Sequence, residues 1–142
     1  MRSFADIEAF LDRDLPAGGH PWTAAQHLDH CAESIACSVD GYPALKPAII
    51  RGTIGKLVKR RFLARGAMRH DITAPVPGSV APPPRALDDA RASLRAAIER
   101  FRAHAGPLAP HPVYGRCSAA DYEALHAIHF LDHCRGIITK TT

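Results

Sequence analysis

Residues 118–138 read SAADYEALHAIHFLDHCRGII, and the spacing of their side chains predicts a helix with one inward face. Five large side chains recur at intervals of three and four residues: Tyr122, His126, His129, His133 and Ile137. That interval keeps side chains on one face of an α-helix. Three of the five are imidazoles, and burying them is costly unless hydrogen bonds, buried water or a metal ion satisfy them. The segment therefore predicts a core helix that also carries a polar site.

His129 and His133 are four residues apart, so a helix places their imidazoles one turn apart, where both can bind one metal ion. A third imidazole is available from His27 or His30, in a second helix expected over about residues 23–40. Three protein ligands leave coordination positions open, which is typical of catalytic metal sites. The alternative from the residues alone is a partly exposed face whose histidines are ordinary polar side chains. Phe130 follows His129, so the segment lacks the glutamate of the zinc-metalloprotease motif.

Capping patterns and apolar periodicity predict four helices besides the last one, with approximate bounds of 3–14, 23–40, 47–63 and 87–104. Ser3, Thr23 and Ser118 each stand where an N-cap is needed, and each has Asp or Gln three residues later to complete a capping box. Gly52 and Gly55 weaken the third helix. Because β-branched runs are scarce and no segment alternates for long, we expect an all-α fold.

A loop is expected over about residues 66–85, which contain five prolines: Pro75, Pro77, Pro82, Pro83 and Pro84. Prolines at this density exclude a helix or a central strand. A loop this long in a compact domain is often functional, and the alternative is an ordered wrap around the bundle.

The composition bounds the class of protein. The chain has 142 residues with 46% hydrophobic and 6% aromatic side chains, which suits one helical domain spanning residues 1–142. No apolar run approaches the length that crosses a bilayer, so we expect no membrane partner. Acidic residues soon follow Met1 without a small-residue cleavage site, which favours a cytoplasmic location. The four cysteines form no CxxC pair, and we expect reduced core residues at Cys31, Cys37, Cys117 and Cys134.

The basic residues gather between Lys56 and Arg69, and the formal net charge of the chain is +4. Such a run suits an anion or nucleic-acid patch, but it is more often the solvated face of a helix. Phe62 is the one aromatic residue that interleaves with the charges for base stacking. We therefore do not expect nucleic acid to be the partner.

Two segments resemble the DinB-like (DinB/YfiT) superfamily. Residues 22–30, which read WTAAQHLDH, are similar to the tryptophan-to-histidine opening of its second helix. The HPVYG element at residues 111–115, followed by a capped helix that ends in HFLDH at residues 129–133, resembles an uncharacterised branch of that superfamily. The resemblance extends from Trp22 to Arg135.

The resemblance implies a four-helix bundle with a long crossover connection and an extra short helix. It also implies a divalent transition metal, such as zinc, nickel or iron, bound by three histidines: His30, His129 and His133. His30 is preferred to His27 because of its distance after Trp22. Relatives often carry a histidine at the position of Asp132, and we expect this side chain to point away from the site.

The other histidines are expected beside the metal site or at the surface. His126, one turn before His129, is a candidate proton-transfer group, with a fourth ligand or a hydrogen-bonded wall residue as the alternatives. His111 either faces the mouth of a pocket or is fixed in its loop by Pro112. His27 is a neighbour of the site or partly exposed. Three more histidines are expected at the surface: His20, His70 and His104.

By resemblance, the expected activity is a metal-dependent thiol S-transferase, with a hydrolase second. A low-molecular-weight thiol would then be a cofactor, and the small-molecule substrate is not indicated by the sequence. The alternative is a non-catalytic homodimeric bundle that binds a metal or a small ligand. Association with nucleic acid is the third interpretation.

Overall fold

The computed structural model describes residues 1–138 of the chain, and over this range it contains helices and no strand. The helices are α1 (Phe4–Leu11), α2 (Ala24–Asp40), α3 (Ala48–Gly52), α4 (Ile54–Arg65), α5 (Leu87–Ala103) and α6 (Ala119–Ile138). The expectation of an all-α bundle is therefore confirmed. No helix within residues 1–138 combines the length and the apolar character needed to span a membrane.

The helix starts follow the capping residues of the sequence. Ser3 and Thr23 are the N-caps of α1 and α2, and each closes a full capping box. The Ser118 hydroxyl accepts from the amide of Asp121 at 3.0 Å, and the Asp121 carboxylate accepts from the amide of Ser118 at 3.3 Å. Such boxes satisfy amide groups that have no partner inside the helix. The predicted starts of these helices are correct to within one residue.

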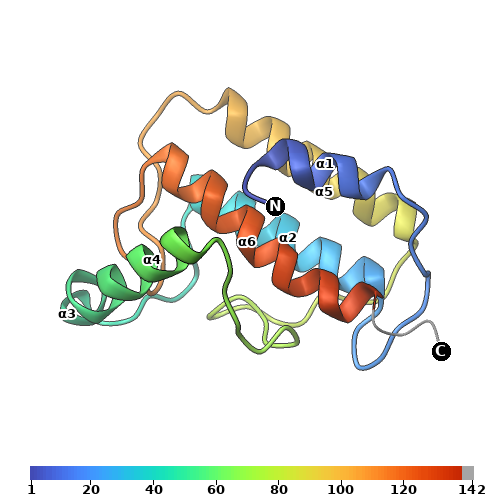
Figure 1. The fold of residues 1–142 in the computed structure, drawn as a ribbon, viewed down its shortest axis with the longest axis horizontal. Coiled ribbons are helices and arrows are strands. Elements are labelled where there is room, and N and C mark those ends of the chain that lie inside the picture. Colours follow the sequence, from blue (N-terminus) through green and yellow to red (C-terminus); the bar gives the residue numbers. More distant parts are fainter. Residues whose placement is uncertain (139–142) are drawn as a thin grey trace.

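Four helices, α1, α2, α5 and α6, run alongside one another, while α3 and α4 lie at one end of this bundle (Figure 1). The most extensive packing is between α2 and α5, and α6 packs against both α2 and α1. The core between them is apolar and fully buried, with contributions from all four helices: Phe4, Ile7, Leu11, Leu28, Ile35, Leu94, Ile98, Phe130 and Ile137. This core fixes how α2 and α6 face one another.

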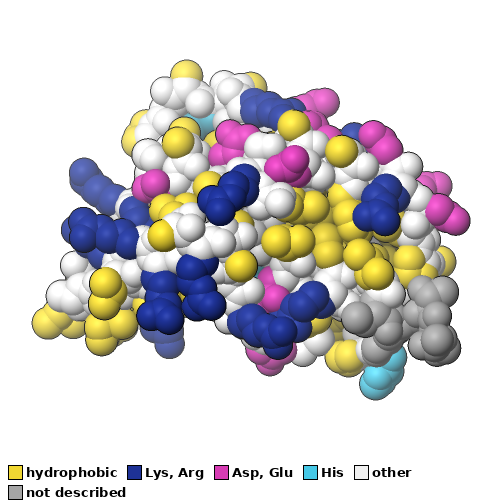
Figure 2. All heavy atoms as spheres, viewed as in Figure 1, with side chains coloured by type: hydrophobic (Ala, Val, Ile, Leu, Met, Phe, Trp, Pro, Cys, Tyr) yellow, Lys and Arg dark blue, Asp and Glu magenta, His cyan; other side chains and the backbone are white. Residues whose placement is uncertain are grey.

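The prediction of one continuous helix over residues 47–63 is wrong, because this segment forms two helices, α3 and α4. Thr53 has φ −121° and ψ −94°, outside the helical region, and it separates α3 from α4. Its hydroxyl donates to the carbonyl of Ile49 at 2.5 Å. A side-chain hydrogen bond of this kind competes with the helical backbone. Lys and Arg side chains gather at this end of the molecule (Figure 2).

Gly55 allows α4 to approach the loop that precedes α6. A Cβ atom at this position would lie 1.9 Å from the carbonyl oxygen of Val113. Gly55 therefore permits a close backbone contact that a residue with a side chain would block, although its helix propensity is low. Beyond it, Val58 and Phe62 of α4 pack against a small apolar cluster that includes Ile128 of α6.

The proline-rich loop between α4 and α5 wraps around the bundle in an ordered conformation, which is one of the two expectations from the sequence. It passes beneath α2 and α6 (Figure 1). Val76 is buried, and the buried amide of Gln26 donates to the carbonyl of Pro82 at 2.7 Å. Arg85 forms an ion pair with Asp29 of α2. Because these contacts hold the loop against α2, its side chains have fixed positions beside the bundle.

Candidate metal centre

Four histidines meet where α2, α6 and the proline-rich loop come together. His30 comes from α2, His129 and His133 come from α6, and His70 comes from the loop. Each offers one ring nitrogen, and the four nitrogens lie within 4.8 Å of one another. The sequence predicts that His30, His129 and His133 share a site, and the fold brings these three together. The fold adds His70, for which the sequence predicts a surface position.

The separations between the nitrogens suit a shared ion. His129 Nε2 lies 3.3 Å from His30 Nε2 and 3.2 Å from His133 Nε2. His70 Nε2 lies 3.2 Å from His133 Nε2. Four nitrogens at about 2.0–2.1 Å from one tetrahedral ion would be about 3.3–3.4 Å apart. The donor set and these three separations therefore fit a divalent transition metal.

Burial keeps these imidazoles neutral. It lowers the pKa of His30 to about 4, and the neighbouring His70 and His27 add to this effect. Burial and the adjacent imidazoles also lower the pKa of His129 and His133 well below the ordinary value. The pKa of His70 is lowered by burial as well, although Asp132 opposes the shift. Neutral imidazoles carry the lone pairs that metal binding requires.

Asp132 holds His70 in the cluster. Its Oδ2 atom lies 2.7 Å from His70 Nδ1 and accepts from the backbone amide of His70 at 2.9 Å. A carboxylate at Nδ1 favours the tautomer that carries its proton there, which leaves the Nε2 lone pair for a metal. The expectation that Asp132 points away from the site is wrong, because its carboxylate is buried against the loop.

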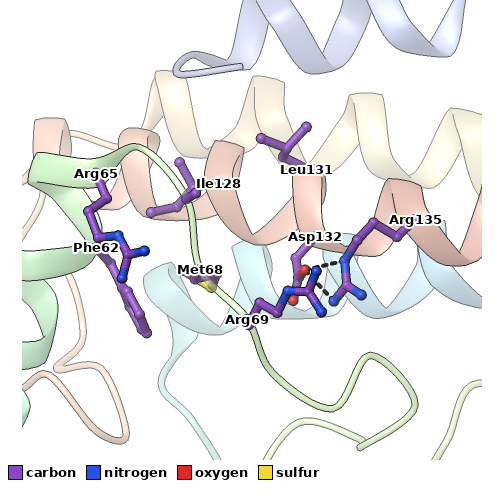
Figure 3. Close-up of a pocket in the computed structure, with 9 residues that line it drawn as sticks. Phe62, Arg65, Met68, Arg69, Ile128, Leu131, Asp132 and Arg135 are labelled. Atoms are coloured by element: carbon purple, nitrogen blue, oxygen red, sulfur yellow. Dashed lines mark hydrogen bonds and ion pairs between the residues drawn. The ribbon is translucent and has the colours of Figure 1, made fainter.

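Arg135 in turn fixes Asp132, since its Nε atom donates to Asp132 Oδ1 at 2.6 Å (Figure 3). This pair also lines a groove of about 520 Å³ between α4, the start of the proline-rich loop and α6. Arg65 and Arg69 also line the groove, and Phe62 is part of its wall. The guanidinium of Arg135 thus compensates the buried charge of Asp132.

His27 lies behind the cluster, as a neighbour of the site. It is buried, and its Nδ1 atom lies 2.9 Å from Nδ1 of His133. Trp22 stacks on His133 with ring centroids 6.5 Å apart and an interplanar angle of 14°. Gly136 makes room for this arrangement, because a Cβ atom there would lie 2.5 Å from Nε2 of His27. The orientation of His133 is therefore set by packing on both sides.

His126 lies outside the four-histidine cluster. Its Nε2 atom lies 3.3 Å from the hydroxyl of Ser38, which itself donates to the carbonyl of Ile35 at 2.5 Å. Its ring stacks on Tyr122 with centroids 5.4 Å apart. Burial lowers the pKa of His126 to about 3. These contacts suit the wall residue that the sequence analysis held as one alternative, and a role in proton transfer stays a prediction.

A cavity of about 300 Å³ lies next to the cluster, lined by α2, α6, the proline-rich loop and the loop that precedes α6. His30, His70 and His129 line one side, and His111 and Tyr114 line another. His111 is also fixed in its loop, because its Nδ1 atom accepts from the amides of Val113 and Tyr114. His111 therefore lines the cavity, which is one of the two interpretations from the sequence, and its ring is held by the amides of Val113 and Tyr114. His20 is exposed, and His104 is partly exposed, as expected.

The four cysteines are free, and three of them are buried. Cys31 and Cys134 pack in the apolar core. Burial raises the pKa of the Cys134 thiol to about 12. Cys31, Cys37 and Cys134 are therefore buried core residues, as expected, whereas Cys117 is only partly buried. None of the four belongs to the histidine cluster.

The family model described as "Protein of unknown function (DUF1569)" matches residues 3–140. No curated protein and no solved structure matches the chain.

Proposed function

This chain belongs to the DUF1569 family of proteins of unknown function, and we propose that it binds one divalent transition metal. The ligands are His30, His129 and His133, with His70 as the fourth. The observation that carries the proposal is the convergence of four ring nitrogens within 4.8 Å. Each neutral imidazole has one N–H and one acceptor nitrogen. Without an ion, the acceptor nitrogens of the four rings would therefore face one another with few N–H groups to bind them.

Imidazole ligands suit zinc, nickel and iron, so the ligand set by itself does not select among them. When bound, such an ion supplies a Lewis acid and lowers the pKa of a coordinated water or thiol. The chain supplies the surroundings: Asp132 orients His70, and the proline-rich loop covers one side of the site. The cavity beside His129 gives a small molecule access to the ligands.

The finer proposal is a metal-dependent thiol S-transferase, or else a hydrolase, with a small thiol as cofactor. It rests on the resemblance to the DinB-like superfamily and on the cavity beside the cluster. His126 is the candidate proton-transfer group because it lines that cavity. Its pKa of about 3 makes it a weak base at neutral pH, which favours the role of a wall residue instead.

The second candidate function is a non-catalytic metal-binding bundle. The contribution of His70 favours it, because a tetrahedral ion bound by four protein ligands has no open position. An ion with five or six ligands would keep positions open despite His70. This candidate includes assembly as a homodimer, which sedimentation of the metal-loaded protein would test.

Elemental mass spectrometry on untagged protein tests the metal proposal. We expect about one zinc, nickel or iron per chain, as in sites with this ligand count. His129→Ala should lose the metal, whereas His20→Ala should keep it, because His20 is exposed and outside the cluster. Absence of metal in the wild type, even after reconstitution with zinc and with nickel, would overturn the proposal.

An assay for thiol-dependent consumption of an electrophile separates the two candidate functions. The enzyme should turn over only when loaded with metal, and His129→Ala should abolish turnover. Loading without turnover for any thiol or ester substrate would favour the non-catalytic bundle. His70→Gln is informative here, because it should open a coordination position while leaving the three predicted ligands in place.

A further inference from the structure

We propose that the cavity beside His30 and His129 binds a small uncharged molecule that has an aromatic or apolar body and one hydrogen-bond-accepting oxygen. The claim that this molecule is the substrate rests on the proposed function. The claim that it binds is independent of that function, because the features that select it lie in the cavity wall. The volume of about 300 Å³ has room for about ten water molecules, so the ligand is small.

No lysine, arginine, aspartate or glutamate is among the described residues that line this cavity. Lys59 of α4 does not line the cavity and is bound to Asp121 at 2.9 Å. A charged ligand would lose its hydration without gaining a counter-charge from the wall, and this is costly. A metal at the cluster would supply positive charge at one side only. The body of the ligand is therefore uncharged.

The wall favours a flat or apolar body. Tyr114 and His111 stack on one another with centroids 4.1 Å apart and an interplanar angle of 10°. Phe62, Met68 and Leu125 line the cavity as well. Aromatic and thioether side chains pack well against rings and short hydrocarbon chains.

The hydrogen-bond donors in the wall are mostly occupied. The Tyr42 hydroxyl donates to the carbonyl of Ser34 at 3.1 Å, and the Tyr122 hydroxyl donates to the carbonyl of Ala109 at 2.6 Å. Each phenol has a single hydrogen, so neither has one left for a ligand. The two phenols therefore offer no donor to a ligand.

His111 has a donor to spare. Its Nδ1 atom accepts from the amides of Val113 and Tyr114 at 3.1 and 3.2 Å. The hydrogen of the neutral ring is therefore on Nε2, and this atom forms no hydrogen bond with the described residues 1–138. This N–H, with the Ser34 hydroxyl, matches an accepting oxygen such as that of a ketone, an amide or an ether.

Calorimetric titration with acetophenone, toluene and benzoate tests the proposal, on the protein as purified and again after loading with zinc. We expect acetophenone to bind in both preparations. Toluene, which lacks the oxygen, should bind about fivefold to tenfold more weakly, the value of one neutral hydrogen bond. Benzoate should not bind without added metal. Equal binding of benzoate and acetophenone to the metal-free protein would overturn the proposal.

A matched pair of variants locates the binding. Ala74 is exposed and lines the cavity, so Ala74→Trp should fill part of it and abolish acetophenone binding. Ala81 is exposed in the same loop and does not line the cavity, so Ala81→Trp should bind as the wild type does. Retention of binding in Ala74→Trp would overturn the assignment to this cavity.

The outcomes separate this inference from the metal proposal. Acetophenone binding that Ala74→Trp abolishes, in a protein that never takes up metal, supports the cavity and contradicts the metal site. Metal uptake without any binding of acetophenone in either preparation contradicts the cavity and leaves the metal site intact.

Discussion

The carboxylate of Asp132 lies 2.7 Å from Nδ1 of His70, and this contact connects the proline-rich loop to the last helix. Asp132 is one residue before His133, so the helix presents a ligand and the partner of another ligand side by side. The contact brings His70, from outside the bundle, to the imidazole nitrogens of the α2 and α6 histidines. The cluster is thus built by two helices and one anchored loop.

Asp132→Asn should weaken metal binding by about 10–100-fold, the usual effect of removing a carboxylate that orients a histidine ligand. The physical reason is that an amide holds the tautomer and the position of His70 less firmly. Competition with a chromophoric chelator measures the affinity. Asp88→Asn is the control, because the Asp88 side chain is 98% exposed. Unchanged affinity in Asp132→Asn would show that His70 is not held as a ligand.

The metal-free protein should lose stability as the pH falls from about 6.5 to about 4. The pKa values of His30, His111 and His126 are lowered by burial to about 4, 4 and 3 from an ordinary value of 6.5. The unfolded chain therefore binds protons in this range that the folded chain does not. The contribution of the neutral histidines to the free energy of unfolding is fully present above the unfolded pKa. Below it, each histidine lowers the free energy of unfolding by on the order of 1 kcal/mol per pH unit.

Urea unfolding with a chelator present, at about pH 7.5 and in steps down to about pH 4.5, measures this slope. His126→Phe should make the slope shallower by about one proton, since Phe cannot titrate. His20→Phe should leave it unchanged, because His20 is exposed. The same slope in wild type and His126→Phe would contradict the account.

Gly55→Ala should destabilise the protein by about 1–3 kcal/mol, the usual cost of overpacking. The added Cβ would lie 1.9 Å from the carbonyl oxygen of Val113, so α4 or the loop must move. Gly52→Ala is the control, because nothing lies within 4 Å of its Cβ position. That variant should gain about 0.4–1 kcal/mol from the reduced entropy of the unfolded chain. Thermal unfolding compares the two, and equal effects would contradict the close approach.

Gly136→Ala should destabilise the protein and weaken metal binding together. An alanine inside a helix is normally favourable, but here its Cβ would lie 2.5 Å from Nε2 of the buried His27. Displacement of His27 also disturbs its 2.9 Å contact with His133. Unfolding and chelator competition measure the two effects. A stabilised variant with full metal affinity would contradict this packing.

Much of the fold was accessible from local patterns. The capping boxes at Ser3, Thr23 and Ser118 marked helix starts because a cap depends on residues only three positions apart. The repeat that contains His126, His129 and His133 predicted an inward face because side chains three or four apart share a face in any helix. The break at Thr53 was missed, since it depends on a side-chain hydrogen bond that propensity does not reveal.

The amino-acid sequence by itself determined the helical class, the helix starts and the pairing of His129 with His133, because all of these depend on neighbours along the chain. The tertiary structure alone decided that His70 joins the cluster and that Asp132 faces it. His70 and Asp132 are 62 positions apart, and their meeting depends on how Gln26 and Asp29 anchor the intervening loop to α2. No local pattern encodes a contact whose geometry is set by packing between distant segments.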